Sequence, residues 1–217
     1  MKLAIYGAGG LGREIAELAI NNNRWDEVFF IDDTKENNTM VEVISTIQYS
    51  SFIQKYSTSK DAIEVLIGVG EPKYREKLYS KVKKDGFKFA TLVSGFSSVS
   101  DNCIIGEGTI VSEFSTIHTN VKIGHNVMIQ PHVTFGHDTI VGNHTVISSY
   151  FAPGGNLVIG NRVYIGNQSA VKESTRIGDD VIVGMGAVVY KDVDNGCVVV
   201  GNPARCTLGN TKHLVFN

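Results

Sequence analysis

A histidine followed directly by an aspartate, at His137 and Asp138, is the pair in this sequence best suited to acid–base chemistry. Imidazole exchanges protons near neutral pH, and a neighbouring carboxylate orients the ring and stabilises the imidazolium that forms when the ring takes up a proton. The other histidines stand at positions 118, 125, 132, 144 and 213, and none of them is followed by an acidic residue. His137 is therefore the candidate general base.

Glycines near the N-terminus form a second candidate site, because Gly7, Gly9 and Gly12 fit the pattern G-x-G-x-x-G. Between a strand and a helix, such a turn presents backbone N–H groups to a phosphate. Asp32, at the end of the next apolar run, is placed to bind ribose hydroxyls. The pattern predicts a clamp for a nucleotide sugar. A tight turn without a ligand and a dehydrogenase remain alternatives, although the segment is only half of a dinucleotide-binding domain.

Residues 1–93 have the pattern of a small α/β domain that would position this turn. Apolar runs predict strands over residues 3–6, 28–31 and 65–69, and helical spacing follows the first and the third of them. Strands that alternate with helices form parallel sheets. We therefore expect a Rossmann-like, sugar-nucleotide-binding domain over residues 1–93.

From residue 93 onward the periodicity of the sequence changes to six. Apart from one proline, the residues at this spacing are all apolar: Val93, Val99, Ile105, Val111, Ile117, Ile123, Ile129, Phe135, Val141, Ile147, Pro153, Ile159, Ile165, Val171, Ile177, Val183 and Val189. A period of six predicts the hexapeptide repeat of a parallel β-helix, in which each hexad gives a short strand and a corner, and three hexads complete a coil. We expect this β-helix, followed by a short C-terminal tail, over residues 94–217.

Residues 18 apart in the sequence should therefore stack about 4.8 Å apart, which is the spacing of neighbouring strands. No two histidines are 18 apart, so they form no column of metal ligands. Gly155 lies one coil after His137, and the missing side chain leaves room for a ligand beside the imidazole. Ser149, Asn167 and Met185 form a column on another face, which suits the long arm of a cofactor.

Composition and charge limit the remaining function classes. The 217 residues carry a formal net charge of −2, which argues against nucleic acid or an anionic membrane as the main partner. No apolar run is long enough for a signal peptide or a membrane span, so we expect a cytoplasmic protein without membrane insertion. Cys103, Cys197 and Cys206 lack the spacing of metal ligands and are expected to be free thiols in a reducing compartment.

The hexad array and the segments 136–142, 177–189 and 200–205 resemble those of hexapeptide acyltransferases. With the glycine turn joined directly to such an array, the whole chain resembles the sialic acid O-acetyltransferase and bacillosamine/perosamine N-acetyltransferase group, the sugar acyltransferases of bacterial surface glycan synthesis. The resemblance implies an α/β domain followed by a left-handed parallel β-helix. It also implies a homotrimer that binds acetyl-CoA in grooves between neighbouring β-helices and a nucleotide sugar on the N-terminal domain.

The resemblance also assigns roles to individual residues. It implies that His137 and Asp138 are catalytic and that acetyl-CoA contacts Gly155, Asn167 and Met185. The positions that would hold the nucleotide sugar are Gly9, Gly10, Leu11, Asp32, Asp33 and Gly68.

Three further positions follow from the same resemblance. Leu11 stands where many relatives have a histidine. Val146 stands where many relatives have a second histidine that contacts the cofactor, so this contact is either lost or supplied by a neighbour such as His144. The turn at residues 201–204 is expected near the end of the coenzyme.

Together, the residues and the resemblance predict an acetyl-CoA-dependent acetyltransferase that N-acetylates a UDP- or dTDP-linked 4-amino-4,6-dideoxy sugar without a metal. We expect direct attack on the thioester, because the chain has neither a G-x-S-x-G elbow nor an activated cysteine. Backbone N–H groups near Gly155 would stabilise the oxyanion. O-acetylation of sialic acid or another sugar is the alternative. A carbonic anhydrase-like solenoid that binds zinc across a subunit boundary with His132 and His137, and a non-catalytic scaffold, are remoter readings.

Overall fold

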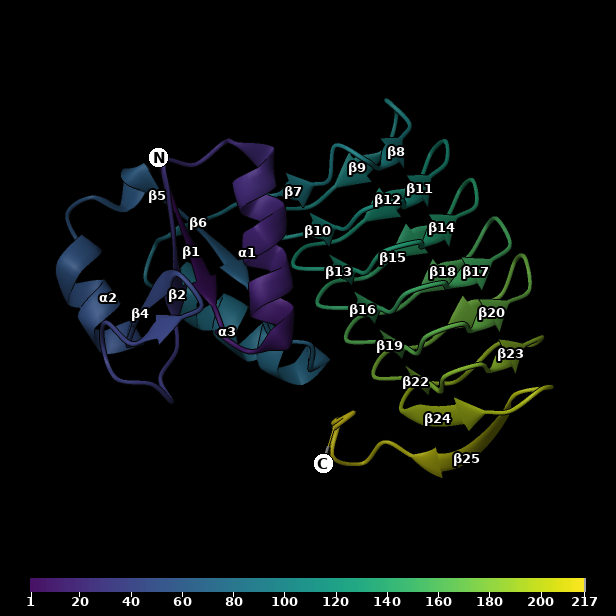
Figure 1. Cartoon of the computed structure of the whole chain (residues 1–217). Coiled ribbons are helices and arrows are strands. Elements are labelled where there is room, and N and C mark those ends of the chain that lie inside the picture. The colour runs from purple at the N-terminus through teal and green to yellow at the C-terminus, as the bar shows by residue number, and fades with distance from the viewer. Residues whose placement is uncertain (217) are drawn as a thin grey trace.

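The computed structural model describes residues 1–216 and contains an α/β domain packed beside a β-solenoid (Figure 1). The α/β domain has a six-stranded sheet of order β3-β4-β2-β1-β5-β6, parallel except for the β3–β4 pair. Its strands are β1 (Lys2–Tyr6), β2 (Glu27–Ile31), β3 (Met40–Val41), β4 (Ile44–Ile47), β5 (Ile63–Ile67) and β6 (Lys88–Phe89). Its helices are α1 (Gly10–Asn22), α2 (Tyr49–Tyr56), α3 (Pro72–Lys84) and a 3₁₀ turn, η1 (Lys60–Ala62).

Helices cover both faces of this sheet, because alternate strand residues point to opposite sides. Leu3 and Ile5 of β1 pack towards α1, whereas Ala4 and Tyr6 pack towards α2 and α3. The predicted parallel α/β domain is therefore confirmed. Its strands β3 and β4 and helix α2 were not predicted.

The solenoid consists of two-residue strands that recur every six residues, as the hexad period predicts. They are β7 (Leu92–Val93), β8 (Ser98–Val99), β9 (Ile104–Ile105), β10 (Ile110–Val111), β11 (Thr116–Ile117), β12 (Lys122–Ile123), β13 (Met128–Ile129), β14 (Thr134–Phe135), β15 (Ile140–Val141), β16 (Val146–Ile147), β17 (Ala152–Pro153), β18 (Val158–Ile159), β19 (Tyr164–Ile165), β20 (Ala170–Val171), β21 (Arg176–Ile177), β22 (Ile182–Val183) and β23 (Val188–Val189). The strands β24 (Cys197–Val200) and β25 (Arg205–Gly209) end the array.

The strands form the three faces of a prism, and most strands pair with the strand 18 residues later. The first face runs from β7 through β10, β13, β16, β19 and β22 to β24 and β25. The second face contains β8, β11 and β14, followed by β17, β20 and β23, and the third contains β9, β12, β15, β18 and β21. The ladder of the second face is interrupted between β14 and β17, although these strands contact each other.

Each face ends in a column of corners, which we call edges 1, 2 and 3. Edge 1 follows the first face and includes residues 130–133, 148–151, 166–169 and 184–187. Edge 2 follows the second face and includes residues 118–121, 136–139, 154–157 and 172–175. Edge 3 follows the third face and includes residues 124–127, 142–145, 160–163 and 178–181.

The hexad anchors fill the interior of the prism, where their burial in apolar surroundings stabilises the coils. Glycine is required at some corners because the neighbouring coil is too close for a side chain. A Cβ atom at Gly136 would lie 2.7 Å from the Cα atom of Gly155. The neighbouring coil therefore leaves no room for a side chain at Gly136.

The α/β domain covers the first face of the solenoid, so that α1 lies between the sheet and the prism (Figure 1). The outward side chains Leu92, Ile110, Met128 and Val146 form one apolar cluster with residues of α1. Because β7 already belongs to a solenoid sheet, the solenoid begins at Leu92. The expected domain boundary at residues 93 and 94 stays a prediction, and residue 217 lies outside the described residues.

The C-terminal hairpin corrects one expectation from the sequence. Cys197 of β24 and Cys206 of β25 form a disulfide, with Cα atoms 5.7 Å apart, so only Cys103 is free among residues 1–216. The spacing of nine residues gave no sign of this pair, and the antiparallel pairing of the two strands brings the cysteines together.

No helix within residues 1–216 combines the length and the apolar character needed to span a bilayer.

Candidate active site

His137 lies on edge 2, two residues after the inward-pointing Phe135. Its Nδ1 atom is 2.7 Å from Oδ2 of Asp138, and Nδ2 of Asn120 donates to Oδ1 of Asp138 at 2.6 Å. The hydrogen bonds from Asn120 and His137 lower the pKa of Asp138. Asp138 is therefore ionised at neutral pH and holds the proton of the imidazole on Nδ1, which leaves Nε2 as an acceptor.

Nε2 of His137 faces Gly155, as the 18-residue stacking rule predicts. A Cβ atom at Gly155 would lie 2.8 Å from this nitrogen, so only glycine leaves the space beside it open. This space belongs to a cavity of about 430 Å³ lined by His137, Asp138, Gly155, Asn156, Glu173 and Ser174. Asn156 and Glu173, together with the Asn120 partner of Asp138, were not predicted as site residues. Asn156 and Asn120 are each 18 residues from Asp138, and Glu173 is 18 residues from Gly155. The 18-residue stacking rule therefore predicts all three positions when it is applied to every site residue in both directions.

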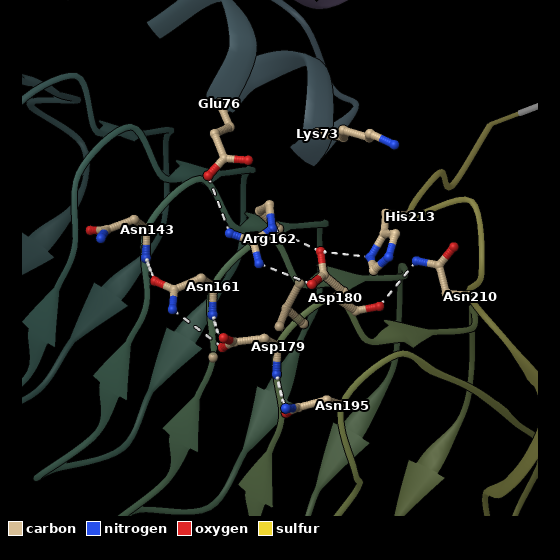
Figure 2. A network of polar contacts seen from close by, with 12 residues as sticks. Lys73, Glu76, Asn143, Asn161, Arg162, Asp179, Asp180, Asn195, Asn210 and His213 are labelled. Carbon is tan, nitrogen blue, oxygen red and sulfur yellow. Dashed lines mark hydrogen bonds and ion pairs between the residues drawn. The ribbon is translucent and has the colours of Figure 1, made fainter. Parts of the chain in front are cut away.

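The backbone N–H groups of His137 and of Gly155 beside it lack acceptors within residues 1–216. On edge 3, the main-chain N–H groups of Asn143, Asn161 and Asp179 each donate to a side-chain oxygen in the following coil, at 2.7–2.9 Å (Figure 2). At the same hexad place on edge 2, the N–H groups of His137 and Gly155 have no acceptor among residues 1–216. These donors are free to stabilise an oxyanion.

The predicted cofactor residues divide between two edges of the same chain. Gly155 is on edge 2 beside His137, whereas Asn167 and Met185 are exposed on edge 1, with Met185 at 75% exposure. The second face of the prism lies between the two edges. The structure therefore does not bring Asn167 and Met185 into the cavity of His137 within one chain.

The surroundings of Val146 and His144 bear on the expected second cofactor contact. Val146 points outward from the first face and is buried against the α/β domain, so it faces no cofactor groove. His144 is on edge 3, where its Nδ1 atom lies 3.0 Å from Nδ2 of Asn126 and its ring contacts Tyr79 of α3 edge-on. Burial, followed by the charge of Arg75, lowers the pKa of His144 to about 4. Within one chain, His144 is therefore packed against α3, and this favours loss of the second cofactor contact.

The glycine turn borders a second cavity at the carboxyl ends of β1, β2 and β5. Its volume is about 460 Å³, and it brings together all six residues expected to hold a nucleotide sugar: Gly9, Gly10, Leu11, Asp32, Asp33 and Gly68. Parallel sheets bind ligands at this end of their strands, and α1 begins there with its N-terminal N–H groups. The cavity therefore has the position and the donors of a phosphate site.

Both acidic residues of this cavity also order the surrounding chain. Asp32 accepts hydrogen bonds from the Ala8 N–H at 3.0 Å and from the Thr34 hydroxyl at 2.6 Å. Burial raises the pKa of Asp32, but the hydrogen bonds from Thr34 and Ala8 outweigh burial and leave this pKa below its usual value. Asp33 accepts from the Tyr6 hydroxyl at 2.6 Å and from the Tyr49 N–H at 2.8 Å. Both carboxylates are thus ionised and held in place.

The histidines proposed for a zinc site lie apart in the prism. His132 is on edge 1, where it stacks between Phe114 and Tyr150, and His137 is on edge 2. Across the described part of the chain, residues 1–216, no three histidine, cysteine or acidic side chains are placed to hold a metal ion.

Comparisons with known proteins agree with this architecture. Residues 2–82 match the PglD N-terminal domain, and residues 120–150 and 156–191 match the bacterial transferase hexapeptide repeats. The acetyltransferase domain of PglB from Neisseria gonorrhoeae FA1090 is 29% identical, with a TM-score of 0.86 over 95% of this chain and 99% of that chain. The structure of the same domain in complex with acetyl coenzyme A is 29% identical, with a TM-score of 0.87 over 95% of this chain and 98% of that chain.

Two other solved structures have the same fold. WeeI from Acinetobacter baumannii AYE is 28% identical, with a TM-score of 0.68 over 95% of this chain and 100% of that chain. PerB from Caulobacter crescentus, solved with CoA and GDP-perosamine, is 22% identical, with a TM-score of 0.84 over 95% and 97%. At that identity the likeness supports the fold alone.

The solenoid, its repeats and the cavity beside His137 define the class of the protein as a hexapeptide-repeat acyltransferase. The glycine-turn domain that precedes the repeats narrows the class further. The chain is similar to the sugar acyltransferases of the sialic acid O-acetyltransferase and bacillosamine/perosamine N-acetyltransferase group. The resemblance stated from the sequence is thereby confirmed, as is its fold, an α/β domain followed by a left-handed β-helix.

Proposed function

We propose that this enzyme transfers the acetyl group of acetyl-CoA to the amino group of a nucleotide-linked 4-amino-4,6-dideoxy sugar, with His137 as general base. The observation that carries the proposal is the arrangement around the imidazole. Asp138 is on Nδ1, and Nε2 faces an open space over Gly155. The acetyl-CoA complex of the PglB domain supports acetyl-CoA as the donor.

The reaction proceeds by direct transfer in this proposal. The amino nitrogen of the sugar attacks the thioester carbonyl carbon while Nε2 of His137 takes up one of its protons. The carbonyl oxygen becomes an oxyanion, and the free N–H groups of Gly155 and His137 are donors for it, each typically worth about 3 kcal/mol. The C–S bond then breaks, and the imidazolium returns its proton to the leaving thiolate. The products are an acetamido sugar and CoA.

The glycine-turn cavity supports a nucleotide sugar as the acceptor. The N-terminal N–H groups of α1 are suited to the pyrophosphate, and the ionised Asp32 is suited to ribose hydroxyls. A free sialic acid carries no phosphate and has no use for such a cavity. The cavity therefore favours N-acetylation of an activated sugar over O-acetylation of sialic acid.

A homotrimer completes the active site in this proposal. The side chain of His137 is 63% exposed, which is too open for a thioester that must be kept from water. Asn167 and Met185 are on edge 1, away from His137 on edge 2. A groove between edge 2 of one copy and edge 1 of the next brings the base and these cofactor residues together.

The experiment that tests this function measures thiol release from acetyl-CoA with a panel of acceptors. The panel contains UDP-, dTDP- and GDP-linked 4-amino-4,6-dideoxy sugars, their 4-hydroxy counterparts and free sialic acid. We expect release with at least one amino sugar and none with its hydroxyl counterpart, together with a mass increase of one acetyl group on the sugar. Release with sialic acid alone would establish the O-acetyltransferase alternative, and release with no sugar would contradict both.

A further inference from the structure

Arg75 is a charged residue without an assigned role, and it is completely buried between the α/β domain and the solenoid. Its guanidinium donates to the carbonyl oxygens of Ile67 and Val69 at 2.8 and 2.9 Å. On the other side it donates to the carbonyl and side-chain oxygens of Asn126 on edge 3, at 2.9–3.1 Å. Burial lowers the pKa of Arg75 to about 9, so the group remains charged at neutral pH.

The acceptors of Arg75 are all uncharged, which is unusual for a buried cation. A buried charge without a counter-ion costs stability. The two carbonyls that Arg75 holds flank Gly68, which borders the glycine-turn cavity together with Val69 and Gly70. Through these two carbonyls Arg75 is connected to the border of the cavity.

Arg75 also sets the direction of the Val69–Gly70 peptide. In a trans peptide the C=O and N–H bonds point in opposite directions. Because the Val69 carbonyl is fixed on Arg75, the Gly70 N–H points away from Arg75, and it has no acceptor among residues 1–216. The Gly68 N–H, in contrast, donates to the Tyr6 carbonyl at 2.8 Å. The N–H groups of Val69 and Gly70 both lack an acceptor among residues 1–216, and Gly70 is the one whose direction Arg75 fixes through the Val69 carbonyl.

We propose that Arg75 is a positioning residue for the acceptor. It holds the Val69–Gly70 peptide so that the Gly70 N–H binds the pyrophosphate of the nucleotide sugar, and it fixes this loop to the solenoid at Asn126. Its positive charge adds to the attraction for the diphosphate. The inference rests on the proposed function, because it assigns a group to the acceptor site of that function.

Calorimetric binding of UDP, dTDP and GDP to the intact protein tests this role, with acetyl-CoA binding measured in parallel. We expect R75M to weaken binding of the diphosphate that the wild type prefers by about tenfold or more. R75K should give an intermediate affinity, because it restores the charge without the planar fork. Acetyl-CoA affinity, and kcat at saturating acceptor, should stay close to wild type in both variants.

R162M is the matched control. Arg162 joins Glu76 of α3 to Asp180 of the solenoid but contacts no carbonyl of the glycine-turn loop (Figure 2). It should leave diphosphate affinity unchanged. Wild-type diphosphate affinity in a folded R75M variant, or an equal loss of diphosphate and acetyl-CoA binding, would overturn the role of Arg75.

A measurement on the wild type decides the matter if the Arg75 variants do not fold. With glycine labelled by ¹⁵N, addition of UDP, dTDP or GDP should shift the Gly70 amide resonance. An unmoved Gly70 resonance beside shifted Gly9 and Gly10 resonances would overturn the proposal while leaving the acceptor site intact. Failure of the wild type to bind any of the three diphosphates would overturn the acceptor site and the role of Arg75 together.

Discussion

The imidazole of His137 has a carboxylate on one nitrogen and an open space opposite the other. Asp138 holds Nδ1, and Asp138 is itself held by Asn120 from the preceding coil. An oriented ring of this kind accepts a proton without first having to reorganise. The chemistry at the residue scale therefore depends on the imidazole of His137 and on the space left open because residue 155 is a glycine.

Removal of the imidazole is the first prediction at this scale. His137→Ala should lower kcat by about 10²-fold or more, because no second imidazole lines the cavity. Thiol release from acetyl-CoA measures the effect. The control is His118→Ala, which removes an exposed histidine from the same edge one coil earlier. Similar turnover in the two variants would remove His137 from the mechanism.

The space over the imidazole gives a second prediction. Gly155→Ala places a Cβ atom 2.8 Å from Nε2 of His137, so the ring must move from its position. We expect a loss of kcat of about 10-fold or more, because small displacements of a catalytic group are costly. Gly95→Ala is the matched control, because a Cβ atom there meets nothing within 4 Å. Full activity in a folded Gly155→Ala variant would show that the space is not used.

At the scale of elements, α3 joins the two domains along edge 3. Arg75, Glu76 and Tyr79 contact Asn126, Arg162 and His144, respectively. His144 is kept neutral in this interface, since burial and the nearby charge of Arg75 disfavour its protonated form. The stability of the interface that positions the glycine-turn cavity therefore depends on pH.

This interface predicts a loss of stability in mild acid. The pKa of His144 is about 4 in the folded chain, against 6.5 for an unperturbed histidine. Between these values the unfolded chain binds a proton that the folded chain does not, so the free energy of unfolding falls as the pH falls. His144→Gln should show a smaller drop in Tm between pH 7 and pH 5 than the wild type. Identical drops would contradict the assignment.

The elements differ in how far the sequence predicts them, for a physical reason. The hexad period is local and repeats in every strand, so it predicts the faces, the edges and the neighbours of His137. The strand β4 and helix α2 have no such period, and their formation depends on packing against Phe29 and Ile31. The contact of Arg75 with Asn126 joins residues 51 apart, and neither residue carries a recognisable motif. The Cys197–Cys206 disulfide likewise depends on the β24–β25 hairpin, which no sequence pattern predicts.

At the scale of the whole molecule, the proposed active site needs more than one chain. The base is on edge 2, the predicted cofactor residues Asn167 and Met185 are on edge 1, and the α/β domain covers the first face. The second and third faces and edges 1 and 2 remain open for neighbouring copies. The proposed homotrimer predicts a mass of three chains in light scattering.

Mixed oligomers test whether two chains share a site. His137→Ala and Met185→Glu should each be nearly inactive alone. When the two are co-assembled in equal amounts, about a quarter of the interfaces combine an intact His137 with an intact Met185, so activity should return. If one chain contains the whole site, no active site can form, and the mixture should stay inactive.

The distance between the base and the acceptor tests the account most directly. It is measured in a crystal structure of the enzyme with CoA and the nucleotide amino sugar that it acetylates. The account predicts that Nε2 of His137 lies about 3 Å from the sugar nitrogen, or is joined to it by one water, with the CoA sulfur in the same inter-chain groove. A sugar nitrogen beyond the reach of His137, or a CoA sulfur at another edge of the prism, would contradict it.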